Sequence, residues 1–177
     1  MERADFVARF GGVFEHSAWI AERAFDRAGD GAGDGGALFG QAAGPLDAAR
    51  LHAALAAEFR AASEAERLGV LKAHPDLAGR IAVAGELTED SRREQAGAGL
   101  DRLTPAEFDR FTDLNTRYQA RFGFPFIIAV KGLTRHEILH AFENRIHHGR
   151  QEEFDAACHE VEKIARLRLE AMDFPSG

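Results

Sequence analysis

Hydrophobic residues recur at intervals of three and four along most of this chain, a spacing that is typical of amphipathic helices. Polar and charged residues occupy the positions between them, so each helical stretch has one apolar face. Glycine, proline and N-cap residues separate these stretches from one another. The pattern predicts helices over residues 5–28 with a break at Gly11 and Gly12, over residues 45–62, 64–73 and 91–100, from Thr104 onward, and over residues 134–148 and 152–172.

Residues 122–132, with the sequence FGFPFIIAVKG, interrupt the helical pattern and are predicted to be extended. A single extended run cannot form a sheet, so its backbone N–H and C=O groups need other partners. Two explanations stay open from the pattern. The segment is either a buried connector satisfied by neighbouring helices, or a surface that holds a small molecule rich in carbonyl and N–H groups.

Composition narrows the class of protein. The chain has 177 residues, 45% of them hydrophobic, which is enough for one globular domain with a substantial core. Its formal net charge of -7 comes without a basic stripe, so nucleic acid is not expected as a partner. A single cysteine favours a reducing compartment, and the sequence shows neither a signal peptide nor an apolar run of membrane-spanning length. We therefore expect a cytoplasmic protein with no membrane partner.

His74 is the first candidate for catalysis. Pro75 disfavours helical dihedral angles at the residue before it, so a helix is predicted to end just ahead of His74. The imidazole titrates near neutral pH, which suits a general acid or base. An ordinary histidine that only satisfies its own hydrogen bonds is the alternative, and the pattern alone favours it.

A second group of candidates follows at residues 91–95. Ser91 is predicted to be a helix N-cap, with Glu94 and Gln95 on the same helical face, which would present a hydroxyl, a carboxylate and an amide together. The first-turn N–H groups, including those of Arg92 and Arg93, are expected to be unpaired and to attract an anion. The S-x-x-E spacing is also that of a capping box, so a purely structural Glu94 is the alternative.

Arg168 is the one charge on the apolar stripe of the last predicted helix. A buried guanidinium requires a carboxylate or another hydrogen-bond acceptor. The pattern favours a protein acid as this partner, and a ligand anion is the alternative.

Residues 136–140, HEILH, match the HExxH motif of zinc peptidases. Thr134 accounts for Glu137 through a capping box. His136 and His140 fall on the polar face of the predicted helix, and the strands of a peptide-binding sheet are missing from the pattern. A zinc-dependent hydrolase that uses these two histidines stays an alternative, but no metal site is expected.

Several motifs occur in one order along the chain: HPDLAGR, SRREQAGAGLD, LNTRY, RFGFPFIIAVKG and KIARLRL. With GVFEHSAWIAERA near the start, this combination resembles the OHCU decarboxylase family, named for 2-oxo-4-hydroxy-4-carboxy-5-ureidoimidazoline (OHCU), an intermediate of urate degradation. The resemblance covers nearly the whole chain. Two departures are Ala18, where the family often has proline, and the glycine-rich residues 29–36.

The resemblance implies an all-α fold: a single compact domain of about eight helices with one extended segment that contacts substrate. It implies a carboxy-lyase that converts OHCU to (S)-allantoin with loss of carbon dioxide, without a cofactor, and often as a homodimer. A helical binding domain that has lost catalysis is the alternative from another function class, although the intact His74, Glu94 and Arg168 argue against it.

The resemblance also implies a role for each matching residue. His74 and Glu94 are expected to be catalytic. For Arg168 the family favours substrate as the partner, in contrast to the pattern alone. The expected substrate-binding residues are Pro75, Ser91, Arg92, Arg93, Glu94, Gln95, Phe126, Ile127, Ile128, Ala129, Val130 and Arg168.

Overall fold

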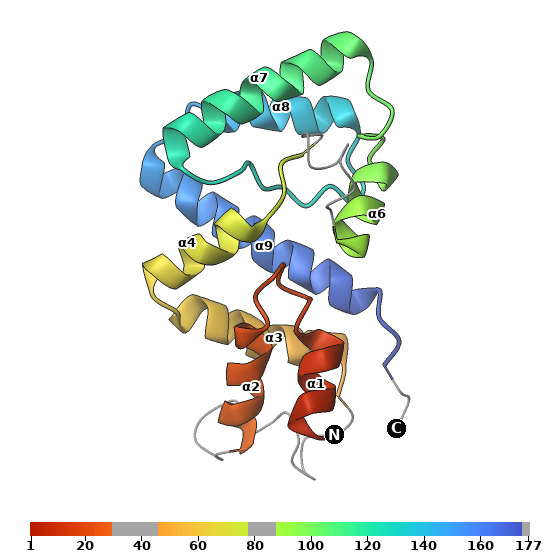
Figure 1. Ribbon diagram of the computed structural model, residues 1–177, viewed down its shortest axis with the longest axis vertical. Coiled ribbons are helices and arrows are strands. Elements are labelled where there is room, and N and C mark those ends of the chain that lie inside the picture. The colour runs from red at the N-terminus through yellow and green to blue at the C-terminus, as the bar shows by residue number, and fades with distance from the viewer. Residues whose placement is uncertain (30–45, 78–87, 175–177) are drawn as a thin grey trace. The chain divides into compact units, whose positions relative to one another are not determined.

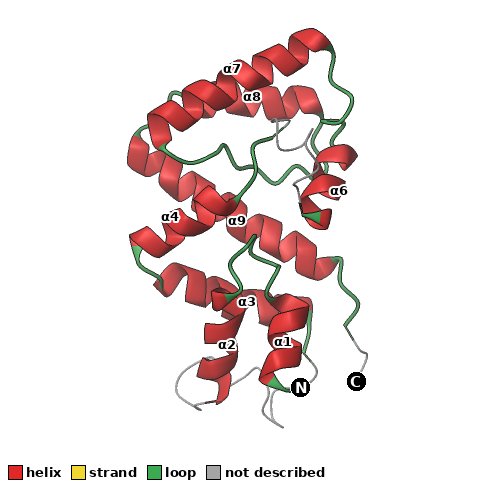
Figure 2. Ribbon diagram, in the orientation of Figure 1, coloured by secondary structure: helices red, strands yellow, loops and turns green. Residues whose placement is uncertain are grey.

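The computed structural model describes residues 1–29, 46–77 and 88–174. All regular secondary structure in these ranges is helical, as Figure 2 shows, which confirms the predicted all-α fold. None of the helices in these ranges combines the length and the hydropathy needed to cross a bilayer. The helices are α1 (Arg3–Phe10), α2 (Trp19–Gly29), α3 (Ala48–Ala61), α4 (Glu64–Ala73), α6 (Glu89–Gly97), α7 (Pro105–Phe122), α8 (Arg135–Arg145) and α9 (Arg150–Glu170).

The chain forms two compact units. The first contains residues 1–73 and 162–177, and the second contains residues 74–161. Helix α9 contributes its first part to the second unit and its last part to the first. The expectation of a single domain stays a prediction.

In the first unit α1 packs against α2, and α2 packs against α3 (Figure 1). Its core contains two pairs of phenylalanine rings. The centroids of Phe6 and Phe10 are 5.0 Å apart, and those of Phe14 and Phe59 are 5.4 Å apart. All four side chains are buried, so the apolar stripe predicted for the N-terminal helices does form the core of this unit.

In the second unit α7 and α8 lie side by side (Figure 1), and Tyr118 and Phe142 meet between them with ring centroids 5.6 Å apart. Phe126 comes from the segment that joins these two helices. Its ring stacks on Phe142 at 4.0 Å and meets Tyr118 edge-on at 5.5 Å. Aromatic packing therefore attaches the connecting segment to the helix pair.

Most helix ends follow local sequence chemistry. Helix α4 ends just before His74, as Pro75 predicts. Thr104 and Thr134 form capping boxes at the starts of α7 and α8. Gly123, with a φ of 80°, ends α7 in the left-handed conformation that glycine adopts without strain. Most of the other predicted helices agree with the observed bounds to within about one turn, but the break predicted at Gly11 and Gly12 is longer than expected: residues 13–18, predicted to be helical, are not, and α2 begins at Trp19.

The prediction that Ser91 caps a helix is wrong. Helix α6 begins at Glu89, and the Thr88 hydroxyl is its cap, accepting the Ser91 N–H at 3.2 Å. Ser91 therefore lies inside the first turn. The Arg92 N–H donates to the carbonyl of Thr88 at 2.9 Å, so it is not one of the unpaired amides of this helix end.

Residues 123–134 join α7 to α8 without helical structure, which confirms the break predicted for this stretch. Most of the glycine-rich residues 29–36 lie outside the described part of the chain.

Candidate active site

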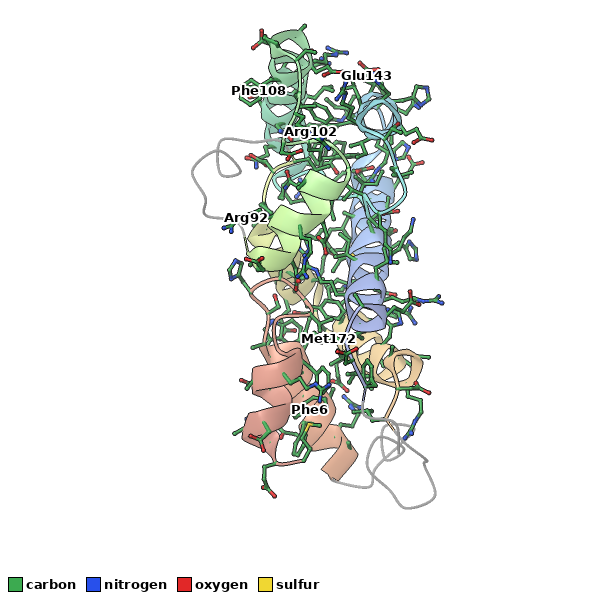
Figure 3. The ribbon with its side chains drawn as sticks, turned by 90° about the vertical axis from the view of Figure 1, so that its right-hand side faces the viewer. Phe6, Arg92, Arg102, Phe108, Glu143 and Met172 are labelled. Atoms are coloured by element: carbon green, nitrogen blue, oxygen red, sulfur yellow. The ribbon has the colours of Figure 1, made fainter. Side chains whose placement is uncertain are left out.

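Helix α6 separates the five candidates at residues 91–95 onto two faces. Ser91 and Gln95 are buried, and Glu94 beside them is half-buried. Arg92 and Arg93 are exposed, and Figure 3 shows the side chain of Arg92 directed away from its helix. The predicted shared face of Ser91, Glu94 and Gln95 is therefore present. The two arginines are on the outer face of the same helix.

The residues after His74 are held by carboxamide side chains from two helices. Gln95 of α6 donates through Nε2 to the carbonyl of Asp76 at 3.3 Å. Asn115 of α7 donates through Nδ2 to the carbonyl of Leu77 at 2.8 Å. His74 itself is 9% exposed. These bonds place the buried face of α6 next to the turn that carries the candidate general acid.

Asn115 holds the turn after His74, a contact that sequence reasoning missed. Its neighbours Phe111 and Tyr118 belong to the apolar stripe of α7, and Asn115 lies on the same buried face. A carboxamide on a buried stripe needs a specific acceptor, which here is the main chain beyond His74. The polar interruption of the stripe was the available signal for this role.

Asp76 is a second titratable group close to His74 in the chain. The pKa of its carboxyl is raised above the ordinary value, because the effect of burial exceeds the opposing effect of the hydrogen bond from Gln119. Gln119 Nε2 donates to Asp76 Oδ1 at 2.9 Å. The His74 turn therefore carries two groups that can hold or release a proton.

The segment expected to contact substrate, residues 126–130, is partly bonded to the protein. Arg145 of α8 donates through Nη1 to the carbonyl of Ile127 at 2.8 Å. The Ala129 N–H donates to Glu160 Oε2 of α9 at 2.7 Å. In contrast, the N–H and C=O of Ile128 have no hydrogen-bond partner among the described residues. Neighbouring helices therefore satisfy some of the polar groups of the segment, while those of Ile128, like those of Phe126, are not bonded to the described residues.

Arg168 lies in the first unit and pairs with a protein acid. Its Nη1 is 2.8 Å from Glu15 Oε2, and it also donates to the carbonyl of Val13 at 3.3 Å. The side chains of Arg168 and Glu15 are only 5% and 1% exposed. The sequence pattern correctly favoured a protein acid, although it did not identify Glu15. A role for Arg168 in binding substrate stays a prediction.

The HExxH match at residues 136–140 has the structure of an ordinary capped helix. Glu137 Oε2 accepts the Thr134 N–H at 2.8 Å, which confirms the capping box. His136 and His140 are both exposed, as the polar-face prediction required. Within the described ranges, no three histidine, cysteine or acidic side chains are grouped so that they could hold a metal ion.

Comparison with known proteins points to one family. The sequence profile described as OHCU decarboxylase matches residues 1–170. A 2-oxo-4-hydroxy-4-carboxy-5-ureidoimidazoline decarboxylase from Halalkalicoccus jeotgali is 40% identical over 98% of this chain and 88% of its own length. The protein of the same name from Haloferax volcanii is 38% identical over 93% of this chain and 86% of its own length.

Two solved structures are similar to this chain. A crystal structure of (S)-allantoin synthase matches with a TM-score of 0.72 and 32% sequence identity. The match covers 97% of this chain and 50% of the chain in that structure. A crystal structure of OHCU decarboxylase in the presence of (S)-allantoin has a TM-score of 0.64 over 89% of this chain and 92% of that one. The sequence identity to the second structure is 23%, so that comparison shows the shared fold alone.

The buried pair of Arg168 and Glu15 predicts a large stability effect. Replacing Arg168 with Met leaves the Glu15 carboxylate buried without its cation, which should cost about 3–5 kcal/mol of unfolding free energy. At roughly 2–4 °C per kcal/mol for a chain of this size, the melting temperature should fall by roughly 10 °C. Thermal melts followed by circular dichroism measure this.

The double variant Arg168→Met/Glu15→Gln should recover most of the loss, because neither charge is then stranded. Arg166→Met is the matched control, since Arg166 pairs with Glu170 on the surface of the same helix, with 66% of its side chain exposed. It should change stability by less than about 1 kcal/mol. An Arg168→Met protein that melts like wild type would show that Glu15 does not depend on this cation.

Proposed function

This chain belongs to the OHCU decarboxylase family, and we propose that it converts OHCU to (S)-allantoin and carbon dioxide without a metal or cofactor. One observation carries the proposal. The Gln95 side chain donates to the carbonyl of Asp76, two residues after His74, so the face of α6 that carries Ser91, Glu94 and Gln95 lies next to the turn that follows the candidate general acid. A base or acid next to a carboxylate and an amide is the arrangement that the reaction needs.

The chemistry assigns His74 to the proton transfer. When the bond to the carboxylate carbon breaks, its electron pair moves into the conjugated ring, and carbon dioxide leaves. The ring carbon then takes up a proton on one face only, which sets the hand of the product. His74 is held at the start of a fixed turn and supplies that proton from one side.

Glu94 and its neighbours bind and orient the substrate in this proposal. Glu94 accepts ring N–H groups or orients His74, while Ser91 and Gln95 complete the same face of α6. Pro75 lines the site next to His74. Helix geometry supports this division, because the buried or half-buried side chains of α6 share one face.

The substrate-binding set is narrower than the family resemblance implied. Arg92 and Arg93 were expected to bind through unpaired N–H groups, but the Arg92 N–H is bonded within the helix and both side chains are exposed. We therefore leave these two out of the proposed site. Of the segment 126–130, we assign the backbone contact to Ile128, because it is half-buried while the other four residues are buried, and its polar groups are not bonded to the described residues.

Two other classes of function are weaker. A zinc hydrolase would need His136 and His140 to face a shared interior site, but both are exposed and Glu137 caps its own helix. A binding domain without catalysis would not need a buried histidine clamped beside a carboxylate-bearing helix face. The proposed decarboxylase uses both the buried histidine and the helix face beside its turn.

The first test is turnover of OHCU freshly generated from urate. Wild-type protein should accelerate the decay of OHCU and give a single enantiomer of allantoin, because one face of the ring receives the proton. Chiral chromatography or circular dichroism of the product measures this. The turnover should survive a strong chelator.

A folded protein that leaves the decay rate and the racemic product unchanged would contradict the proposed function and favour the binding domain. Stoichiometric zinc together with chelator-sensitive turnover would favour the hydrolase instead. His140→Ala separates these cases further, since it should be neutral for a decarboxylase.

Replacing His74 with Asn should lower kcat by about 10²- to 10⁴-fold, the usual effect of removing a general acid. Asparagine keeps the size and some hydrogen bonding of histidine, so the melting temperature should stay close to that of wild type. His140→Asn is the matched control, because it makes the same change at an exposed histidine. Most of the activity surviving in folded His74→Asn would place the proton donor elsewhere, with Glu94 and Asp76 next in line.

We also propose, from the family resemblance, a cytoplasmic enzyme that is a single domain and forms a homodimer. The chain mass is 19.4 kDa, so sedimentation equilibrium should give a species of about twice that mass. A concentration-independent monomer would reject the dimer.

A further inference from the structure

A buried carboxylate in the second unit has three side-chain partners from different parts of the chain. Glu153 of α9 is 0% exposed. Tyr118 of α7 donates its hydroxyl to Glu153, and burial together with this bond raises the pKa of Tyr118, so the phenol keeps its proton. Arg145 Nη2 donates to Oε1 at 2.6 Å, and His148 Nδ1 lies 2.8 Å from Oε2. We call these four residues the Glu153 cluster.

Arg145 connects the Glu153 cluster to the segment that contacts substrate. Two of its guanidinium nitrogens, Nε and Nη2, bond to Glu153, and the third, Nη1, donates to the carbonyl of Ile127 at 2.8 Å. The guanidinium carbon also lies 4.5 Å from the ring centroid of Phe126. The planar, five-donor geometry of arginine makes all three contacts possible at once, which a lysine ammonium cannot reproduce.

The bond to Ile127 acts on the next residue through the peptide unit. The carbonyl of Ile127 and the N–H of Ile128 belong to one planar peptide group, and none of the described peptide bonds is cis. In a trans peptide these two groups point in opposite directions. The Ile128 N–H is therefore directed away from Arg145, and it has no partner among the described residues.

We propose that Arg145, held by Glu153, is a positioning residue that polarises the peptide between Ile127 and Ile128 and aims the Ile128 N–H at the substrate. A cation bonded to a carbonyl draws electron density from the attached nitrogen, and the N–H becomes a stronger donor. Such a donor stabilises the negative charge that builds on the ring as carbon dioxide leaves. The identity of the substrate in this inference rests on the proposed function. The polarisation of the Ile128 amide does not depend on that function.

The arrangement is difficult to explain by stability alone. A buried ion pair often contributes little to stability compared with well-packed hydrophobic side chains. Phe126 is already fixed by the ring of Phe142 at 4.0 Å, so the segment has an apolar attachment without the arginine. Arg145 adds a positive charge that is hydrogen-bonded to one particular carbonyl, that of Ile127.

Kinetics on two variants test the inference. Arg145→Met/Glu153→Gln removes both charges without stranding either one, so it should fold, and its kcat should fall about 10²-fold, as on loss of one donor to a developing charge. Its KM should change much less. Arg145→Lys keeps a cation near the carbonyl and should lose less of kcat than the double variant. Arg110→Met is the control and should match wild type, because its partner Glu143 is on the surface.

A second measurement does not depend on activity. In protein labelled with ¹⁵N-isoleucine, the Ile128 amide resonance should move upfield in the double variant relative to wild type, and by more than that of any other isoleucine. If wild-type protein does not decarboxylate OHCU, the proposed function fails, and this resonance still decides the inference. An unchanged Ile128 resonance, or a double variant with wild-type kcat, would overturn it.

Discussion

Each unit of this protein contains an arginine that pairs with a buried carboxylate and also donates to a main-chain carbonyl. In the first unit Arg168 pairs with Glu15 and donates to Val13. In the second unit Arg145 pairs with Glu153 and donates to the carbonyl of Ile127, in the segment that joins α7 to α8. Burying such charges is tolerable only when every partner is in place, so the pairs define where the non-helical main chain runs. Helical packing then supplies the hydrophobic stabilisation around them.

The proposed site combines side chains on a helix with a histidine on a turn. The side chains of Ser91, Glu94 and Gln95 are placed by helical periodicity, which fixes their relative positions. The turn after His74 has no regular structure of its own and takes its position from side chains of α6 and α7. A catalytic group carried on a turn but bonded to two helices can be as well oriented as one on a helix.

Sequence reasoning succeeded where the physics is local. The stop at His74 follows from Pro75, and the capping box at Thr134 accounts for Glu137 in both sequence and structure. It was wrong where two local signals compete: Thr88 and Ser91 are both good caps, and spacing alone could not choose between them.

Long-range partners were beyond the reach of the pattern. A buried arginine on an apolar stripe predicts that an acid must exist, but not that Glu15 is that acid. The role of Asn115 was similarly hidden, because its acceptor lies on a distant part of the chain. Most of the fold could therefore be predicted from the sequence. For the proposed site, the sequence identified candidate residues, but it did not predict which hydrogen-bond or ion-pair partners hold them.

The carboxamides around the His74 turn have a consequence for acid–base behaviour. Gln95 and Asn115 bond to the main chain of the turn, and Gln119 bonds to the Asp76 side chain. None of the three gains or loses a proton over the working range of an enzyme, so these donors are not lost as the solution is acidified. Even a protonated Asp76 keeps a carbonyl oxygen that can accept from Gln119. Changes of rate with pH should then report the ionisation of reacting groups, undistorted by loosening of the turn that carries them.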